Sequence, residues 1–239
     1  MIKVKRISFF LLALTLTGCA TTGVEKVEKL PTGHQIVVLS VLGNDLNVQT
    51  TGTTIFTNWQ RTQDVSDWNI DAKLEDFIRN ELTRAGKFIA VAADTADVRK
   101  TVGAVTQNEW TSKLEVEGGM ESLSDFATSA GADSVILVGS HRKQDFIFNT
   151  NQYIEGYGIY QRSGLFGSKK AVDYAIVYVW LVESGSDIAR VLKFHHSPRQ
   201  ESEWVEKDGQ LSPGKQHREE IEALLKLAVG EALTELTLR

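Results

Sequence analysis

Two short patterns in this 239-residue chain contain residue types that could do chemistry. In SPGK, residues 212–215, Ser212 and Lys215 have the S-x-x-K spacing that places a lysine one helical turn from a serine nucleophile. No S-D-N or K-T-G sequence accompanies it, and a serine followed by proline is also a common start of a helix. The chain has neither a G-x-S-x-G sequence nor a phosphate-binding loop of the G-x-x-x-x-G-K-[ST] form, so we predict no catalytic residue and no cofactor.

His195 and His196 form the second pattern, because histidine is the commonest metal ligand. They fall in a predicted strand, where adjacent side chains point to opposite faces, so one ion cannot easily bind both. His141, at the end of another predicted strand, could approach one of them, but no third ligand is apparent. The sequence therefore predicts no metal site.

Cys19 is the only cysteine of the chain, and it follows a basic and then an apolar segment. Three basic residues precede about ten mostly apolar residues, 7–16, a stretch too short to span a membrane, which takes about 20 residues. This pattern predicts a secretory signal peptide over residues 1–18. Its last residues and the cysteine, LTGC at 16–19, resemble the lipobox of bacterial lipoproteins.

The lipobox resemblance implies cleavage before Cys19 and a lipid anchor on that residue, with palmitate among the acyl chains. Residues 19–33 would then be the lipidated cysteine and a polar tether that spans about 20 Å. Ala20 stands where an Asp would retain such a protein in the inner membrane, which implies the outer membrane, facing the periplasm. Once Cys19 is consumed no disulfide can form, so the fold must be held by its own core.

The charge of the mature chain limits its partners. Loss of residues 1–18 removes three of the 26 basic residues and none of the 31 acidic ones, which leaves 23 against 31 and a formal charge of −8. Nucleic acids are bound by clustered Lys and Arg, so we expect no nucleic-acid partner. Membrane attachment falls to the lipid on Cys19, and no small-molecule substrate is evident.

Apolar spacing predicts one globular domain over residues 34–239. Strands are expected at 36–42, 46–51, 87–92, 133–140, 171–182 and 187–194, and helices at 70–85, 94–103, 123–130 and 215–236. This order predicts an α/β (α+β) fold, a single mixed β-sheet with helices packed on it. Strand 46–51 is expected to return beside 36–42 as a hairpin. Phe77 is expected at the centre of the buried stripe of its helix, and Glu219 and Glu220 on a solvated helix face.

Three stretches of the chain are similar to one group of periplasmic and outer-membrane proteins. They are LEDFIRNELTRAGKFIAVAAD at 74–94, LSDFATSAGADSVILVGS at 123–140 and VYVWLVESGSDIAR at 177–190. The group includes the TolB N-terminal domain, the curli-secretion lipoproteins and the lipoprotein activators of penicillin-binding proteins. The resemblance implies a TolB N-terminal-like fold and a non-enzymatic binding or assembly module. The long segment 145–170 departs from the group's pattern.

That departing segment is rich in aromatic residues and glycine. Tyr157, Tyr160, Arg162 and Phe166 stand among four glycines, and aromatic residues beside arginine are typical of contact surfaces. We expect these four residues to form an exposed contact surface. Two alternatives stay open: a long β-hairpin whose aromatic residues fold back onto the sheet, and a membrane-spanning hairpin of the kind found in the curli-secretion proteins.

These observations predict a lipid-anchored, non-catalytic adaptor or assembly lipoprotein of the bacterial envelope. Its expected partner is another envelope protein or a second copy of itself. The alternative is an oligomeric pore or secretion-channel subunit of the outer membrane.

Overall fold

The computed structural model describes residues 30–103, 105–107, 114–164, 168–185, 189–196, 200–206 and 215–238. The predicted signal peptide, Cys19 and most of the tether lie outside them. The strands are Gln35–Ser40 (β1), Asp45–Thr51 (β2), Trp59–Asp64 (β3), Ile89–Val91 (β4), Val105–Gln107 (β5), Leu114–Val116 (β6), Ser134–Ser140 (β7), Arg142–Gln144 (β8), Tyr153–Ser163 (β9), Lys169–Glu183 (β10), Ala189–His196 (β11) and Gln200–Glu201 (β12). The helices are Ile55–Thr57 (η1), Ser66–Trp68 (η2), Ile70–Ala85 (α1), Ala96–Val102 (α2), Gly119–Ala130 (α3) and Lys215–Leu238 (α4).

Ten of these strands form one mixed sheet, which confirms the predicted fold class. Its main order is β3-β2-β9-β10-β7-β1-β4, and β5 pairs only with β6. The pairs β1–β7, β1–β4 and β2–β9 are parallel, while β10 pairs antiparallel with all its neighbours. Strand β9 pairs with the first half of β10 and β7 with the second half, so the long strand β10 joins the two wings of the sheet.

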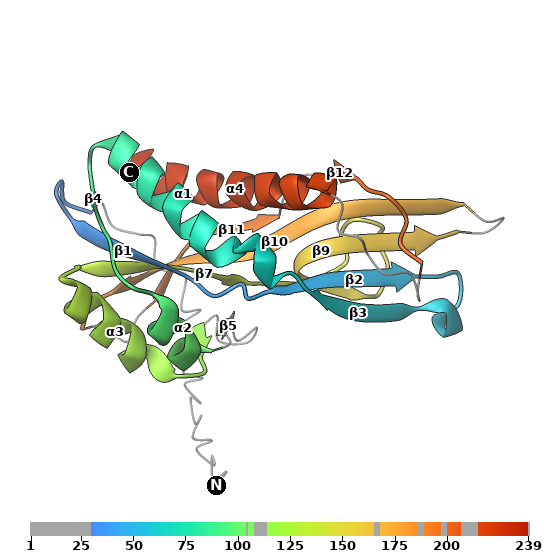
Figure 1. Cartoon of the computed structure of the whole chain (residues 1–239), viewed down its shortest axis with the longest axis horizontal. Helices are drawn as coiled ribbons and strands as arrows, with labels where there is room; N and C mark the ends of the chain where they lie inside the picture. Colours follow the sequence, from blue (N-terminus) through green and yellow to red (C-terminus); the bar gives the residue numbers. More distant parts are fainter. Residues whose placement is uncertain are drawn as a thin grey trace, which may run out of the picture.

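Helices cover both faces of this sheet (Figure 1). Helices α1 and α4 lie on one face, and α2 and α3 lie on the other face at the end that holds β1 and β7. At the opposite end, the loop between β8 and β9 covers the second face with Ile147, Phe146 and Phe148. None of the described helices is both long and apolar enough to cross a membrane.

The alternation of β10 explains why both faces must be covered. Its odd-numbered residues, such as Ala175 and Val177, face α1 and α4, whereas the even-numbered Tyr174, Ile176 and Trp180 face the other side. A strand that is apolar on both faces is typical of the centre of a sheet, as predicted from the sequence of this segment.

Helix α1 has the predicted bounds, but its buried stripe is shifted from the predicted one. Ile70, Leu74, Ile78 and Leu82 are at most 2% exposed, whereas Phe77 is only partly buried at the rim of the same core. Successive i, i+4 positions drift around a helix of 3.6 residues per turn, which leaves Phe77 beside the stripe rather than at its centre. The helix ends at Gly86, whose φ of +65° suits glycine.

The predicted hairpin between 36–42 and 46–51 is wrong. Strand β2 pairs with β3 and β9, and β1 pairs with β4 and β7. The two strands follow one another along the sheet because Leu42, Gly43 and Asn44 continue the chain forward instead of reversing it. The edge strand β3 alternates half-buried and exposed residues. Its sequence WQRTQD is mostly polar, so the pattern of apolar residues did not predict it.

Ile78→Ala is expected to lower the free energy of unfolding by about 2–5 kcal/mol, because it leaves a cavity between α1 and the sheet. Asn80→Ala, on the exposed side of the same helix, should change it by no more than about 0.5 kcal/mol. Chemical denaturation of the purified protein measures both. Equal effects of the two variants would contradict the packing of α1.

Candidate functional site

Tyr157 and Tyr160 are 1% and 0% exposed, so the predicted exposed contact surface is wrong at both positions. They lie in the middle of β9 and point to opposite faces of the sheet. The Tyr157 hydroxyl donates to the carbonyl oxygen of Gly43 over 2.9 Å. The open alternative, aromatic residues folded back onto the sheet, describes these two tyrosines.

The hydroxyl of Tyr160 is part of a buried network. It donates to Asp145 Oδ2 over 3.0 Å and lies 2.9 Å from Thr51 Oγ1 and 2.8 Å from Thr150 Oγ1. Burial raises the pKa of Tyr160 to about 12, so it stays a neutral donor. Of the other two predicted residues, Arg162 is exposed and donates to the Phe148 carbonyl oxygen, and Phe166 lies outside the described residues.

Glycine did not break β9, although its frequency suggested a loop. Gly158 lies opposite Asn47 of β2, and a Cβ at Gly158 would be 1.9 Å from the Asn47 carbonyl oxygen. Gly156 has φ +63°, a conformation that glycine adopts without strain. Gly158 therefore allows β2 to approach β9 closely within the sheet.

Tyr157→Ser and Tyr160→Ser are each expected to cost about 3–5 kcal/mol of stability, because each removes a buried ring and a satisfied hydroxyl. Arg162→Ser, at the exposed position of the same strand, should cost less than about 1 kcal/mol. Urea denaturation compares the three variants. A wild-type unfolding midpoint for either tyrosine variant would restore the contact-surface interpretation.

One buried polar cluster fastens α1 and α2 to the end of β1. Asp71 Oδ1 accepts hydrogen bonds from Ser40 Oγ at 2.6 Å and from the Leu42 amide at 2.9 Å, and Asp71 Oδ2 accepts one from the Gly43 amide at 3.3 Å. A second carboxylate, Glu75, accepts from Arg99 Nη2 at 2.7 Å. Every carboxylate oxygen has its own donor, so this cluster is a closed structural network.

Stability should depend on pH through Asp71. Burial raises the pKa of Asp71, so the folded protein binds a proton there more tightly than the unfolded chain does. The contribution of Asp71 to stability is therefore greatest at low pH and is lost as pH rises through its folded pKa. Asp71→Asn does not titrate. The unfolding free energy of the wild type relative to this variant should fall as pH rises above about 4, the ordinary pKa of an aspartate. A difference that increases over this range would contradict the shift.

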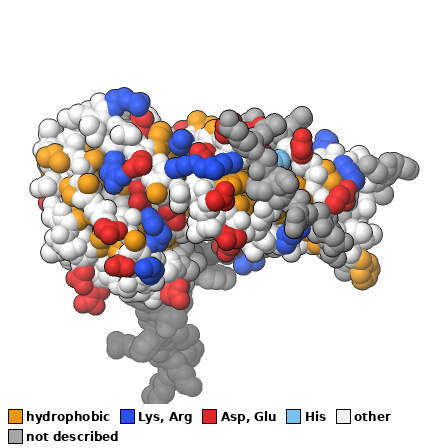
Figure 2. Space-filling model, viewed as in Figure 1, with side chains coloured by type: hydrophobic (Ala, Val, Ile, Leu, Met, Phe, Trp, Pro, Cys, Tyr) orange, Lys and Arg blue, Asp and Glu red, His pale blue; other side chains and the backbone are white. Residues whose placement is uncertain are grey.

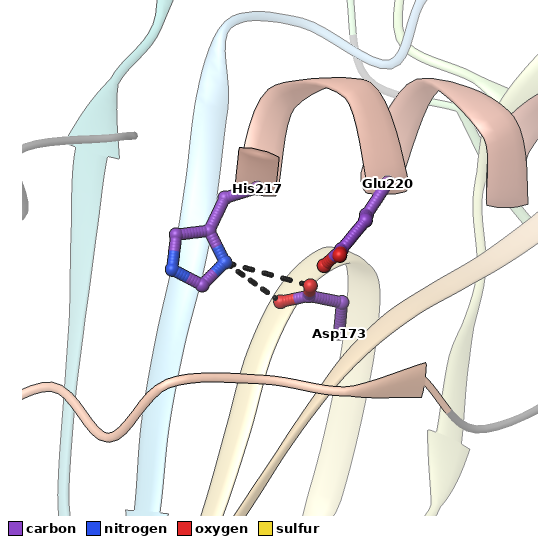
Figure 3. A group of neighbouring side chains, drawn as sticks. All are labelled: Asp173, His217 and Glu220. Atoms are coloured by element: carbon purple, nitrogen blue, oxygen red, sulfur yellow. Dashed lines mark hydrogen bonds and ion pairs between the residues drawn. The ribbon is translucent and has the colours of Figure 1, made fainter. Parts of the chain in front are cut away.

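A second buried cluster joins β10 to the start of α4 and is the candidate site (Figure 3). Asp173 of β10 is 0% exposed, His217 in the first turn of α4 is 7% exposed, and Glu220 is half-buried. One ligand atom from each lies within 4.8 Å of the others. His217 Nδ1 is 3.3 Å and 3.4 Å from the two Asp173 oxygens, and 3.3 Å from Ser202 Oγ.

The local sequence explains how this site is built. His217 and Glu220 are three residues apart on α4, which places them on one helix face. Asp173 has an odd number on β10 and therefore faces α4, as Ala175 and Val177 do. The hydrogen bond between His217 and Asp173 raises the pKa of His217, whereas burial lowers it. The negative charges of Asp173, Glu220 and Glu203 also raise this pKa. The imidazole is thus surrounded by carboxylates.

The sequence pointed to three other histidines as possible metal ligands. His195 and His196 belong to β11, but their side chains are outside the described set. His141 packs against Tyr178 with ring centroids 4.0 Å apart, and burial lowers its pKa to about 4. Glu219 is exposed as expected, whereas Glu220 turns toward Asp173. The H-x-x-E spacing of α4 was a signal for two of the three residues, but nothing local indicated Asp173.

The visible surface offers no charge-segregated site. Figure 2 shows acidic and basic side chains interspersed over the described part of this face. The large exposed apolar residues of the described chain lie on four separate elements: Phe56, Ile89, Tyr153 and Leu227.

No protein-family model matches the chain, and no curated protein is significantly similar to it. Solved structures of bacterial proteins share a weak structural likeness with it. One is a hypothetical protein from Chlamydia trachomatis, with 12% identity and a TM-score of 0.35, covering 87% of this chain and 95% of that one. Another is a Xanthomonas campestris protein of the DUF330 family, with 11% identity and a TM-score of 0.34, covering 87% and 83%. At these values neither likeness carries an argument about function.

Proposed function

We propose that this protein is a lipid-anchored, non-catalytic adaptor or assembly lipoprotein of the bacterial envelope, held to the outer membrane and facing the periplasm. The observation that carries the proposal is the register of the N-terminus: basic residues, a short apolar segment and LTGC ending at Cys19. Its resemblance to the TolB N-terminal, curli-secretion and penicillin-binding-protein activator group supports a binding role. The mixed sheet with helices on both faces is compatible with that group.

A lipid anchor also suits the composition of the protein. The charge of −8 after loss of residues 1–18 disfavours attachment to anionic lipid by charge, whereas acyl chains contribute about 0.8 kcal/mol per buried methylene. Partner binding would then occur close to the membrane, since residues 19–33 span about 20 Å as a flexible tether. Another envelope protein, or a second copy of the chain, is the proposed partner.

The pore alternative has less support from the described residues. A membrane-spanning β9–β10 hairpin would have to expose Tyr157, Tyr160 and Tyr174, which are at most 2% exposed. The size of the full chain in mild detergent distinguishes the alternatives. An adaptor should run as a monomer or dimer, and a channel subunit as a larger closed ring.

Cys19→Ser is expected to abolish labelling with palmitate and release the protein from the membrane fraction, because serine cannot form the thioether. Metabolic labelling and fractionation of cells measure both effects, and circular dichroism of the released chain should show the wild-type fold. Cys19 lies far from the described core in sequence, so stability should change little. A wild-type protein that is unlabelled and soluble would contradict the proposal.

A further inference from the structure

Two buried aspartates of this protein differ in how their charge is satisfied. Asp71 receives three hydrogen bonds spread over both oxygens, and Arg99 lies within 3.6 Å of it. Asp173 is less exposed still, yet among the described residues the only donor within reach of its two oxygens is His217 Nδ1. A single N–H cannot satisfy a buried carboxylate, so at least one oxygen of Asp173 is left without a donor of its own.

The charged groups that act on His217 are acidic. Glu220 and Glu203 act on the same imidazole as Asp173 does, and all three are acidic. Within the described residues, the ion pairs of Asp173 include no lysine or arginine. A divalent cation bound here would place positive charge beside the buried carboxylate of Asp173.

The spacing of the donor atoms suits a small cation better than it suits hydrogen bonds. Nitrogen–oxygen distances of 3.3–3.4 Å are long for a charge-assisted hydrogen bond. Ligand atoms about 2.0–2.2 Å from a tetrahedral Zn²⁺ are about 3.3–3.5 Å apart. The remaining ligand atom comes from half-buried Glu220 and lies within 4.8 Å of the other two, so it must move closer to them when a metal binds.

We propose that Asp173, His217 and Glu220 form a divalent-metal site that fastens the first turn of α4 to β10. One imidazole and two carboxylates are a ligand set that zinc accepts, with a fourth position for water. Ser202 Oγ lies 3.3 Å from His217 Nδ1, beside the proposed site. The metal clamps two elements that lie 44 positions apart in sequence.

The test uses the full chain without an affinity tag, purified in mild detergent and treated with EDTA before Zn²⁺ is added. At a concentration of about 100 Kd, Zn²⁺ is expected to raise the wild-type melting temperature by about 5–10 °C. Equilibrium dialysis of the folded protein measures the affinity directly. Asp173→Asn, His217→Gln and Glu220→Gln are each expected to weaken zinc binding roughly tenfold or more.

Glu219→Gln is the matched control, because it removes the same charge from the neighbouring, exposed position of the same helix. It should keep the wild-type affinity. Mg²⁺ should bind more weakly than Zn²⁺, because it prefers oxygen ligands and avoids imidazole. Glu220→Gln changes a half-buried residue, so it is expected to fold even if Asp173→Asn does not.

The proposal is overturned if millimolar Zn²⁺ neither shifts the melting temperature nor binds in dialysis. It is also overturned if zinc binds equally well to Glu220→Gln and wild type, which would place the metal on other residues. An equal loss of zinc affinity in Glu219→Gln and Glu220→Gln would also overturn it, because it would show that zinc is attracted by the acidic surface in general.

Discussion

Strand β10 is the element on which the rest of this structure depends, because its side chains leave no face to water over most of its length. Ala175, Val177 and Val179 need a layer on one face, and Tyr174, Ile176 and Trp180 need another. Its backbone hydrogen bonds are used as well. Strands β9 and β7 pair with its first and second halves, and β11 and β12 also pair with it. The helices and the β8–β9 loop are arranged around this requirement, since each buried methylene contributes about 0.8 kcal/mol only where water is removed from it.

Polar groups are buried at two places in the core, one at the end of β1 and one on β10. A charge beneath a packed helix costs free energy unless it has partners. At the end of β1, Asp71 and Glu75 meet this cost with Ser40, Thr95 and Arg99. On β10, Asp173 occupies a position where its neighbours on the same face are apolar, and His217 is its described partner. The first arrangement is a closed network, whereas in the second the two oxygens of Asp173 share one described donor.

The proposed envelope role would rely on the outer surface of the domain and on its tether. The tyrosines that looked suited to binding are used internally, where Tyr157 donates to the link between β1 and β2 at Gly43 and Tyr160 anchors the β8–β9 loop through Asp145. An adaptor of this kind would offer its partner a rigid sheet clad in helices, with acidic and basic side chains mixed on the outside. The lipid on Cys19 would attach the protein to the membrane, and a flexible tether of about 20 Å would keep the domain close to it.

Local pattern in the sequence determined the four α-helices and six of the described strands, and their order indicated a mixed sheet. The spacing of Leu74, Ile78 and Leu82 sets a helix, and the two-faced apolar run at 171–182 sets a central strand, because both periodicities follow from backbone geometry alone. The sequence likewise carries LTGC at residues 16–19, on which the proposed lipidation of Cys19 rests. Only the tertiary structure decided which strands are neighbours, that β2 pairs with β9 rather than β1, and that Tyr157 and Tyr160 are buried. The cluster of Asp173 with His217 and Glu220 belongs to the same class, since a contact across 44 residues depends on how a helix docks on a sheet and leaves no periodic trace in the chain.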